Sequence, residues 1–225
     1  MISGTAIEAQ ARAGQIRTGD IFCTHSFAHP IELATGYPFH HVGFVYVNSE
    51  GHINSLEAAK GEGVVQKDFI KTYCDTRRLS FCIFRLLVPD IENNTWREIN
   101  KDEVDKVMAW ALKQWREGDS YNESANWGIF LNMLRGRMMK DNKFADHYYD
   151  AFNCSLFVGH AVFNGINFRI IDPKWKKEGP WNYTPGGIEC WSENKFISAD
   201  IALYKRGRKK RERYIQKQLG SPQAT

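Results

Sequence analysis

Short apolar runs dominate the first ninety residues of the chain. These runs are of strand length, rich in β-branched and aromatic residues and bounded by turn-forming residues, a pattern that predicts β-strands. The predicted strands are Asp20–Thr24, His41–Val47, His52–Ala58 and Phe81–Val88. The second and third flank the turn-rich Asn48–Gly51 and are predicted to form a β-hairpin. Gly43 marks a place in this hairpin where a neighbouring group packs close to the backbone.

The period of the apolar positions changes after residue 100. Apolar residues then recur at spacings of three and four, which predicts a helix that Asn100 caps and that ends before Gly118. A second helix is predicted over Asn126–Met138, and a last strand over Ala199–Tyr204.

A third predicted helix begins at Asn153 or Cys154 and stops at Asn164–Gly165. It is apolar on nearly every side, so we expect it to be buried. Strands in the first half and helices in the second favour an α+β fold over the alternation that builds a parallel α/β sheet.

The length and composition are those of a folded single domain. The chain has 225 residues, of which 43% are hydrophobic, and no repeat or composition shift divides it. The net charge of +4 gathers at the end, where eight Lys and Arg residues lie between Lys205 and Lys217. We therefore predict one domain over 1–204 and a flexible basic tail over 205–225, with contact to an anionic surface as the alternative role of the tail.

The cysteines and the N-terminus bear on the compartment. Five cysteines without a CxxC pair, in a chain of this size, favour reduced thiols. The first twenty residues contain no apolar signal-peptide region, and no apolar run is long enough to span a membrane. We expect synthesis in the cytoplasm without a signal peptide.

Cys154 is a candidate nucleophile. In the first turn of a helix, the exposed N–H groups and the helix dipole favour a thiolate. The alternative is an ordinary buried cysteine, since free cysteines are among the most buried residues.

His41 is a candidate general base for Cys154. It stands at the start of a strand, where an imidazole can project at the open end of a sheet, and His40 beside it is the competitor. A hairpin loop of three or five residues would place His41 opposite Glu57, whose carboxylate could fix the tautomer of the imidazole, whereas a four-residue loop would place Ala58 there. Glu57 is thus the candidate third member of a triad.

Five motifs, in this order, resemble those of the circularly permuted NlpC-type, papain-like hydrolases, and most closely the YiiX/YaeF-like branch. They are Arg17–Phe22 (RTGDIF), His41–Val45 (HVGFV), Leu56–Ala58 (LEA) with Gly63–Val65 (GVV), Gly118–Asn122 (GDSYN) and Asn153–Val158 (NCSLFV). The resemblance spans roughly residues 15–170. It implies a permuted papain-like fold, with an antiparallel sheet packed against helices.

The resemblance also implies a catalytic site. His41 would be the base, Cys154 the nucleophile and Glu57 the polar third member, with no metal and no organic cofactor. The implied activity is that of a cysteine amidase or endopeptidase. Peptidoglycan peptides are the first of the implied substrates, and lipid acyl chains and the amides of proteins or small molecules are the others.

Because peptidoglycan lies outside the bacterial cytosol, we expect an antibacterial effector delivered from the cell, for instance by type VI secretion. Its expected partners are a secretion-machine component and an immunity protein, with no specific nucleic acid. A thiol-dependent lipid acyltransferase or phospholipase, and a catalytically inert binding module on the same fold, are the alternatives.

Overall fold

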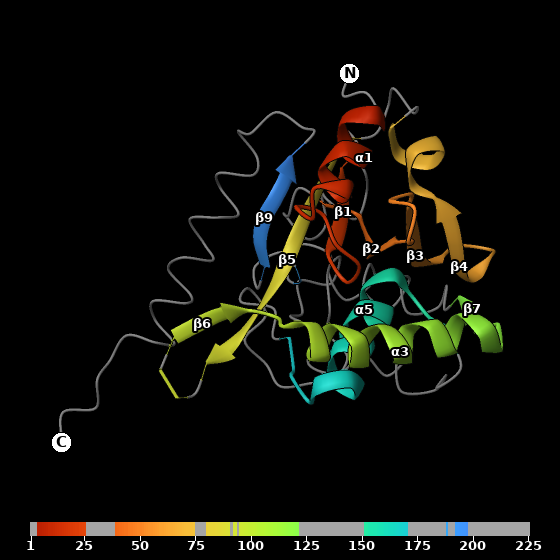
Figure 1. Cartoon of the computed structure of the whole chain (residues 1–225). Coiled ribbons are helices and arrows are strands. Elements are labelled where there is room, and N and C mark those ends of the chain that lie inside the picture. The colour runs from red at the N-terminus through yellow and green to blue at the C-terminus, as the bar shows by residue number, and fades with distance from the viewer. Residues whose placement is uncertain are drawn as a thin grey trace, which may run out of the picture.

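The computed structural model describes residues 4–25, 39–74, 80–90, 92–93, 95–121, 151–170, 188 and 192–197 (Figure 1). The helix predicted over 126–138, the strand predicted over 199–204 and the basic tail lie outside the described residues. The described part is a mixed α+β structure in which an antiparallel sheet packs against helices.

A seven-stranded sheet forms the centre of the molecule. Its strands are β1 (Ile21–His25), β2 (His41–Val47), β3 (Ile53–Ala59), β4 (Gly63–Asp68), β5 (Ser80–Asp90), β6 (Thr95–Glu98) and β9 (Ser192–Ile197). They follow the order β4-β3-β2-β1-β5-β6, and β9 also pairs with β5. Every pairing in this sheet is antiparallel. The four predicted strands are confirmed in β1, β2, β3 and β5.

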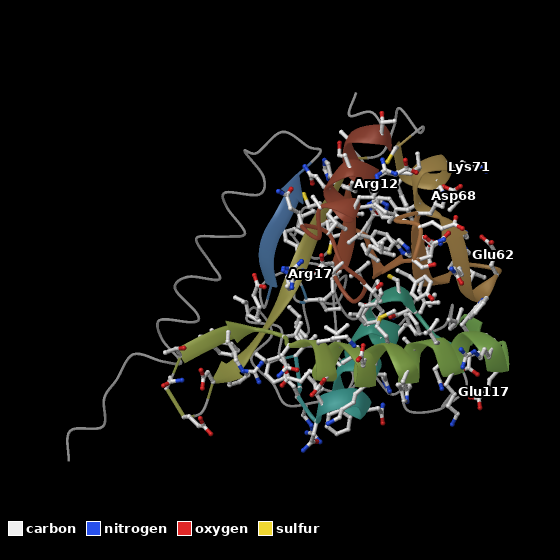
Figure 2. The ribbon with its side chains drawn as sticks, in the orientation of Figure 1. Arg12, Arg17, Glu62, Asp68, Lys71 and Glu117 are labelled. Carbon is white, nitrogen blue, oxygen red and sulfur yellow. The ribbon has the colours of Figure 1, made fainter. Side chains whose placement is uncertain are left out.

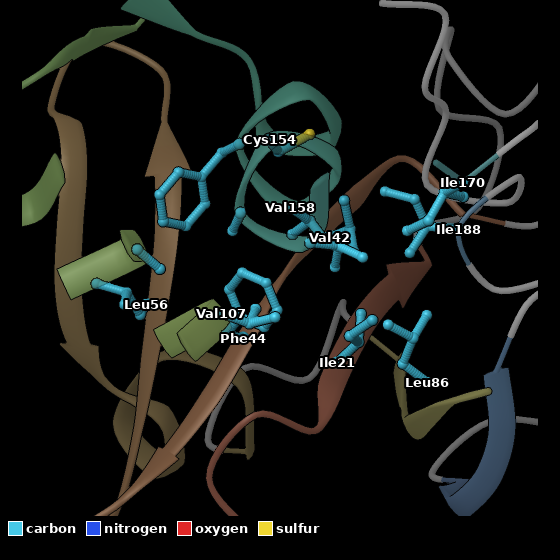
Figure 3. Close-up of a cluster of buried hydrophobic side chains, with 14 of the residues drawn as sticks. Ile21, Val42, Phe44, Leu56, Leu86, Val107, Cys154, Val158, Ile170 and Ile188 are labelled. Carbon is cyan, nitrogen blue, oxygen red and sulfur yellow. The ribbon is translucent and has the colours of Figure 1, made fainter. Parts of the chain in front are cut away.

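Each face of the sheet carries a separate hydrophobic cluster. Successive residues of a strand point to opposite faces, so neighbours such as Ile21 and Phe22 belong to different clusters. The first cluster holds Ile21, Val42 and Phe44 and packs on α3 (Lys101–Glu117) and α5 (Cys154–Ile166), as Figure 3 shows in part. The second cluster packs on α1 (Gly4–Arg12) and on η1 (Ile70–Cys74), a short π-helix. Charged side chains such as Lys71 and Glu117 lie at the periphery (Figure 2).

The caps of α3 follow the prediction. The Asn100 side chain accepts from the Glu103 N–H at 3.0 Å, and the Glu103 carboxylate accepts from the Asn100 N–H at 2.9 Å, a capping box. The helix ends at Gly118, whose φ of 74° lies in the left-handed region that favours glycine.

The end of α5 differs from the prediction. The helix does not stop at Asn164–Gly165 but continues to Ile166, and Asn167 caps it in a left-handed conformation. A Cβ placed on Gly165 would lie 2.7 Å from the N and Cα of Val107. Gly165 therefore allows α5 to approach the backbone of α3 and does not end the helix.

The register of the β2–β3 hairpin differs from both that the sequence left open, in which Glu57 or Ala58 lies opposite His41. The observed pairs run from Val47 with Ile53 to Phe44 with Leu56, and one further step places Glu57 opposite Gly43. Residues 48–52 form the connecting loop, in which Asn48 Oδ1 accepts from the N–H groups of Glu50 and His52. Because of this turn, His52 lies outside β3. The pairing is shifted by two residues from the register in which His41 would lie opposite Glu57.

Candidate active site

Cys154 is the first residue of α5 and directly follows Asn153, the residue that caps this helix. The short strands β7 (Ser120–Tyr121) and β8 (Ala151–Phe152) pair in parallel directly before Asn153. Asn153 caps the helix through its side-chain Oδ1, which accepts from the Leu156 N–H at 2.8 Å and from the Ser155 hydroxyl at 3.2 Å. Cys154 is 5% exposed, and its sulfur lies at the N-terminal end of α5 (Figure 3).

His41 lies between a thiol and a carboxylate. Its imidazole hydrogen-bonds to the Cys154 thiol, and its Nε2 is bonded to Glu57 Oε2. The side chain of His41 is 19% exposed, whereas that of Glu57 is 1% exposed. The structure thus brings together the three residues that the sequence singles out.

The electrostatics of this group favour a charged imidazole. Burial lowers the pKa of His41, but the charge of Cys154 and its hydrogen bond, together with the hydrogen bond and charge of Glu57, outweigh burial and raise that pKa to about 10. At neutral pH His41 is therefore an imidazolium.

Gly43 makes the contact between His41 and Glu57 possible. Residues 41 and 43 share one face of β2, so His41 reaches Glu57 along a diagonal that passes Gly43. A Cβ on Gly43 would lie 2.9 Å from the Cβ of Glu57 and 2.6 Å from Cε1 of Phe22. The prediction that a neighbouring group packs against the backbone at Gly43 is confirmed.

Glu57 is a buried carboxylate with three hydrogen-bond donors. Besides His41, the Tyr73 hydroxyl donates to Oε2 at 2.5 Å, and the Ser55 hydroxyl donates to Oε1 at 2.9 Å. Burial raises the pKa of Glu57, but the bonds from His41, Tyr73 and Ser55 outweigh it and lower that pKa. The carboxylate is therefore ionised and fixed in orientation.

Sequence reasoning missed Tyr73 and Ser55. Ser55 stands two residues before Glu57 on the same strand, so the period of a strand could have placed its side chain on the same face. Tyr73 lies on η1, where it packs on Phe22 and Phe69 with ring centroids 4.9 and 5.0 Å apart. No local signal connects it with Glu57.

His40, the competitor for the role of base, lies elsewhere. Its Nε2 is 3.3 Å from the Thr24 hydroxyl, and its N–H donates to the Thr24 carbonyl at 3.1 Å. The described geometry therefore favours His41 over His40 as the partner of the thiol.

The described residues contain no group of three or more His, Cys, Asp and Glu side chains that could hold a metal ion. In the same part of the chain, no helix is both long enough and apolar enough to cross a membrane.

Neither the protein-family models nor the curated proteins contain a match to the sequence. Among solved structures, the chain is similar to a crystal structure of the metalloprotein YiiX from Escherichia coli O157:H7. The two share 16% sequence identity with a TM-score of 0.47, over 84% of this chain and 92% of that one.

Proposed function

We propose that the protein is a cysteine-dependent hydrolase of amide or ester bonds, with Cys154 as the nucleophile, His41 as the base and acid, and Glu57 as the residue that orients His41. The observation that carries the proposal is the position of His41, bonded to Cys154 on one side and to a buried carboxylate on the other. Such a chain of nucleophile, base and orienting group is the arrangement that nucleophilic catalysis needs.

The proposed reaction begins with attack of the Cys154 thiolate on the substrate carbonyl carbon. The new C–S bond forms while the carbonyl π electrons move to oxygen, which gives a tetrahedral oxyanion. Its collapse expels the leaving amine or alcohol, which takes a proton from His41, and leaves a thioester. Neutral His41 then accepts a proton from the attacking water, and hydrolysis releases the acid and restores the thiolate.

For the substrate, we propose peptide bonds of peptidoglycan, cut by an effector that is delivered out of the cell. The support is the order of the motifs around His41 and Cys154, which resembles permuted NlpC-type hydrolases. The proposal includes the permuted papain-like type of the fold, a secretion-machine component and an immunity protein as partners, and a target-cell periplasm as the place of action.

The second candidate is a thiol-dependent lipid acyltransferase or phospholipase. The basic residues between Lys205 and Lys217 favour it, since a cluster of cations attracts an anionic membrane surface. The chemistry at Cys154 would be the same, and only the acyl donor and acceptor would differ.

A thiol-directed probe tests the catalytic pair. At neutral pH, iodoacetamide should label Cys154 faster than the other cysteines, and His41→Ala should lower this rate by roughly tenfold or more. His40→Ala, a change at the neighbouring position, is the matched control and should leave the rate within about twofold. Equal rates in wild type and His41→Ala would show Cys154 to be inert, as in a binding module.

Two further experiments separate the substrates. Incubation with peptidoglycan fragments and with phospholipids, followed by mass spectrometry, identifies the bond that is cut, with Cys154→Ala as the blank. Expression with and without an export signal tests the effector role, since lysis should require both export and Cys154. Equal tolerance of exported wild type and Cys154→Ala would exclude wall hydrolysis.

A further inference from the structure

The side-chain amide of Asn153 has a donor that the fold does not use. Asn153 is 1% exposed, and its Oδ1 is occupied as the cap of α5. Its Nδ2 is fully buried and has no hydrogen-bond partner among the described residues. A buried polar group without a partner destabilises a protein by about 1–3 kcal/mol, so such a group calls for an explanation.

Capping alone does not explain an asparagine at this position. Ser, Asp and Thr also cap helices through one oxygen, and they carry no amide that must be satisfied. The helix needs Oδ1 only, whereas Nδ2 is an unpartnered donor next to the candidate nucleophile in the chain.

A second donor comes from the adjacent residue. Cys154 is the first residue of α5, and the first N–H groups of a helix have no carbonyl partner within it. The Asn153 amide and the Cys154 N–H therefore belong to consecutive residues at the end of the helix whose dipole is positive.

We propose that Asn153 Nδ2 and the Cys154 N–H bind the carbonyl oxygen of the acyl substrate and stabilise the oxyanion that forms on it. This inference rests on the proposed role of Cys154 as nucleophile. As the C–S bond forms, the π electrons of the carbonyl move to oxygen, and the Asn153 amide donates a hydrogen bond to that oxygen. The amide keeps both of its protons, and its bond to the oxygen is lost when the product leaves.

Two reactions of the same thiol separate this role from a structural one. Acylation by p-nitrophenyl acetate passes through an oxyanion, whereas methylthiolation by methyl methanethiosulfonate involves no carbonyl. Asn153→Ser keeps an acceptor for the Leu156 N–H and removes the amide. We expect it to slow acylation about 100- to 1,000-fold and to change methylthiolation by less than about threefold.

The controls make each outcome decisive. Asn164→Ser changes an exposed asparagine of the same helix, whose Nδ2 donates to the His160 carbonyl, and should leave both rates unchanged. Asn153→Thr repeats the test with a second capping residue if Asn153→Ser melts early. An equal effect on both rates, or no effect on either, in the folded variants would overturn the role of Asn153. If the wild-type thiol shows neither reaction selectively, the proposed function itself fails.

Discussion

Glu57 is an acidic side chain almost entirely removed from water, and its neighbours explain why it remains ionised. Desolvation disfavours a carboxylate, but hydrogen bonds to the charged form favour it. Glu57 accepts from His41, Tyr73 and Ser55, and its pKa falls below the usual range in spite of burial. The ionised Glu57 also raises the pKa of His41, because an anion fixed beside the imidazole favours the protonated form of the ring. Glu57 therefore acts on Cys154 indirectly, through His41.

A first prediction concerns the pKa of His41. The charge and hydrogen bond of Cys154 are the strongest of the effects that raise it, so Cys154→Ala should lower it from about 10 by roughly one unit or more. A raised pKa means that the imidazolium exists up to the alkaline range, and the variant should lose it at lower pH. NMR titration of the His41 ring measures this directly.

The control for that titration is Cys74→Ala, which removes a different, partly exposed thiol. It should leave the His41 titration unchanged. A His41 pKa that is the same in wild type and Cys154→Ala would show that the thiol and the imidazole do not interact.

At the scale of single residues, part of the site could be predicted from the sequence. Asn153 and the apolar run after it predict a helix start at Cys154, and His41 opens a predicted strand. These positions make the two residues candidates, and the resemblance of the ordered motifs to a known family is what pairs them as nucleophile and base. The partners of Glu57 could not be found in this way, since Tyr73 approaches from η1 only after the chain has folded. The catalytic roles of Cys154, His41 and Glu57 stay predictions until a substrate is tested.

Among the secondary-structure elements, β2 packs closely on both of its neighbouring strands at Gly43. Gly43 faces the Phe22 ring of β1 and the Glu57 side chain of β3. Any larger side chain would separate His41 from Glu57 and displace the ring as well. Close packing on both sides makes this strand intolerant of even one added methyl group.

A second prediction follows for Gly43→Ala. The added Cβ should destabilise the fold by about 1–3 kcal/mol and also lower the selective labelling of Cys154, because the His41–Glu57 contact is disturbed. Denaturant unfolding and iodoacetamide kinetics measure the two effects.

Gly165→Ala is the matched control for this variant. Its Cβ would press on the backbone of Val107, so it should destabilise the protein as well, but at the far end of α5 from Cys154. Labelling that falls equally in both variants would attribute the effect to lost stability and not to the strand.

A buried ion pair ties three strands together away from the site. Arg85 of β5 donates from Nε to Asp20 Oδ1 at 2.8 Å and from Nη2 to Asp20 Oδ2 at 3.0 Å. Its Nη1 donates to Glu98 Oε2 of β6 at 3.1 Å. Arg85 is 4% exposed and Asp20 2% exposed. Asp20 lies directly before β1, so the pair holds that strand beside β5.

A third prediction is that Arg85→Met leaves Asp20 as an unpaired buried charge and destabilises the protein by about 3–5 kcal/mol. The double variant Asp20→Asn with Arg85→Met should recover part of this loss, since it removes the orphaned charge. Arg97→Met breaks a more exposed pair with Glu103 and should cost no more than about 1 kcal/mol. Urea denaturation of the wild type and the three variants measures the free energies of unfolding. An equal loss of stability in Arg85→Met and Arg97→Met would contradict the prediction.

Elements with strong apolar periodicity could be predicted from the sequence, and weak ones could not. The strands β1, β2, β3 and β5 and the helices α3 and α5 carry such patterns. The sequence does not predict the other described elements, which are α1, β4, η1, β6, β7, β8 and β9. Two of them show why: only Ile7 and Ala11 of α1 are buried, and β9 has the polar sequence SENKFI. The conformation of these elements depends on tertiary packing, which cannot be predicted from the local sequence pattern.

At the scale of the whole molecule, the residues of the candidate site lie far apart in the sequence and close together in the folded chain. His41 and Glu57 belong to the strand-rich first half, and Cys154 to a helix that begins more than a hundred residues after His41 in the sequence. The order of strands and helices predicted an α+β fold, and an antiparallel sheet packed against helices is what the structure shows. The packing of α5 on the sheet is what brings the thiol to the imidazole, so the reactivity of Cys154 should depend on the global fold.

A fourth prediction tests that dependence. Since no local segment contains both Cys154 and His41, the excess labelling rate of Cys154 over Cys74 should vanish with the same urea midpoint as the change in tryptophan fluorescence. Cys74 has no part in the candidate site, so its labelling rate should rise as the chain unfolds. Over the same range of urea, the labelling rate of Cys154 should fall to that of Cys74. If the excess rate of Cys154 disappeared well before the fluorescence changed, α5 would detach from the sheet as a separate unit, and the two clusters would not stabilise one cooperative core. If it persisted after unfolding, His41 would not be its source.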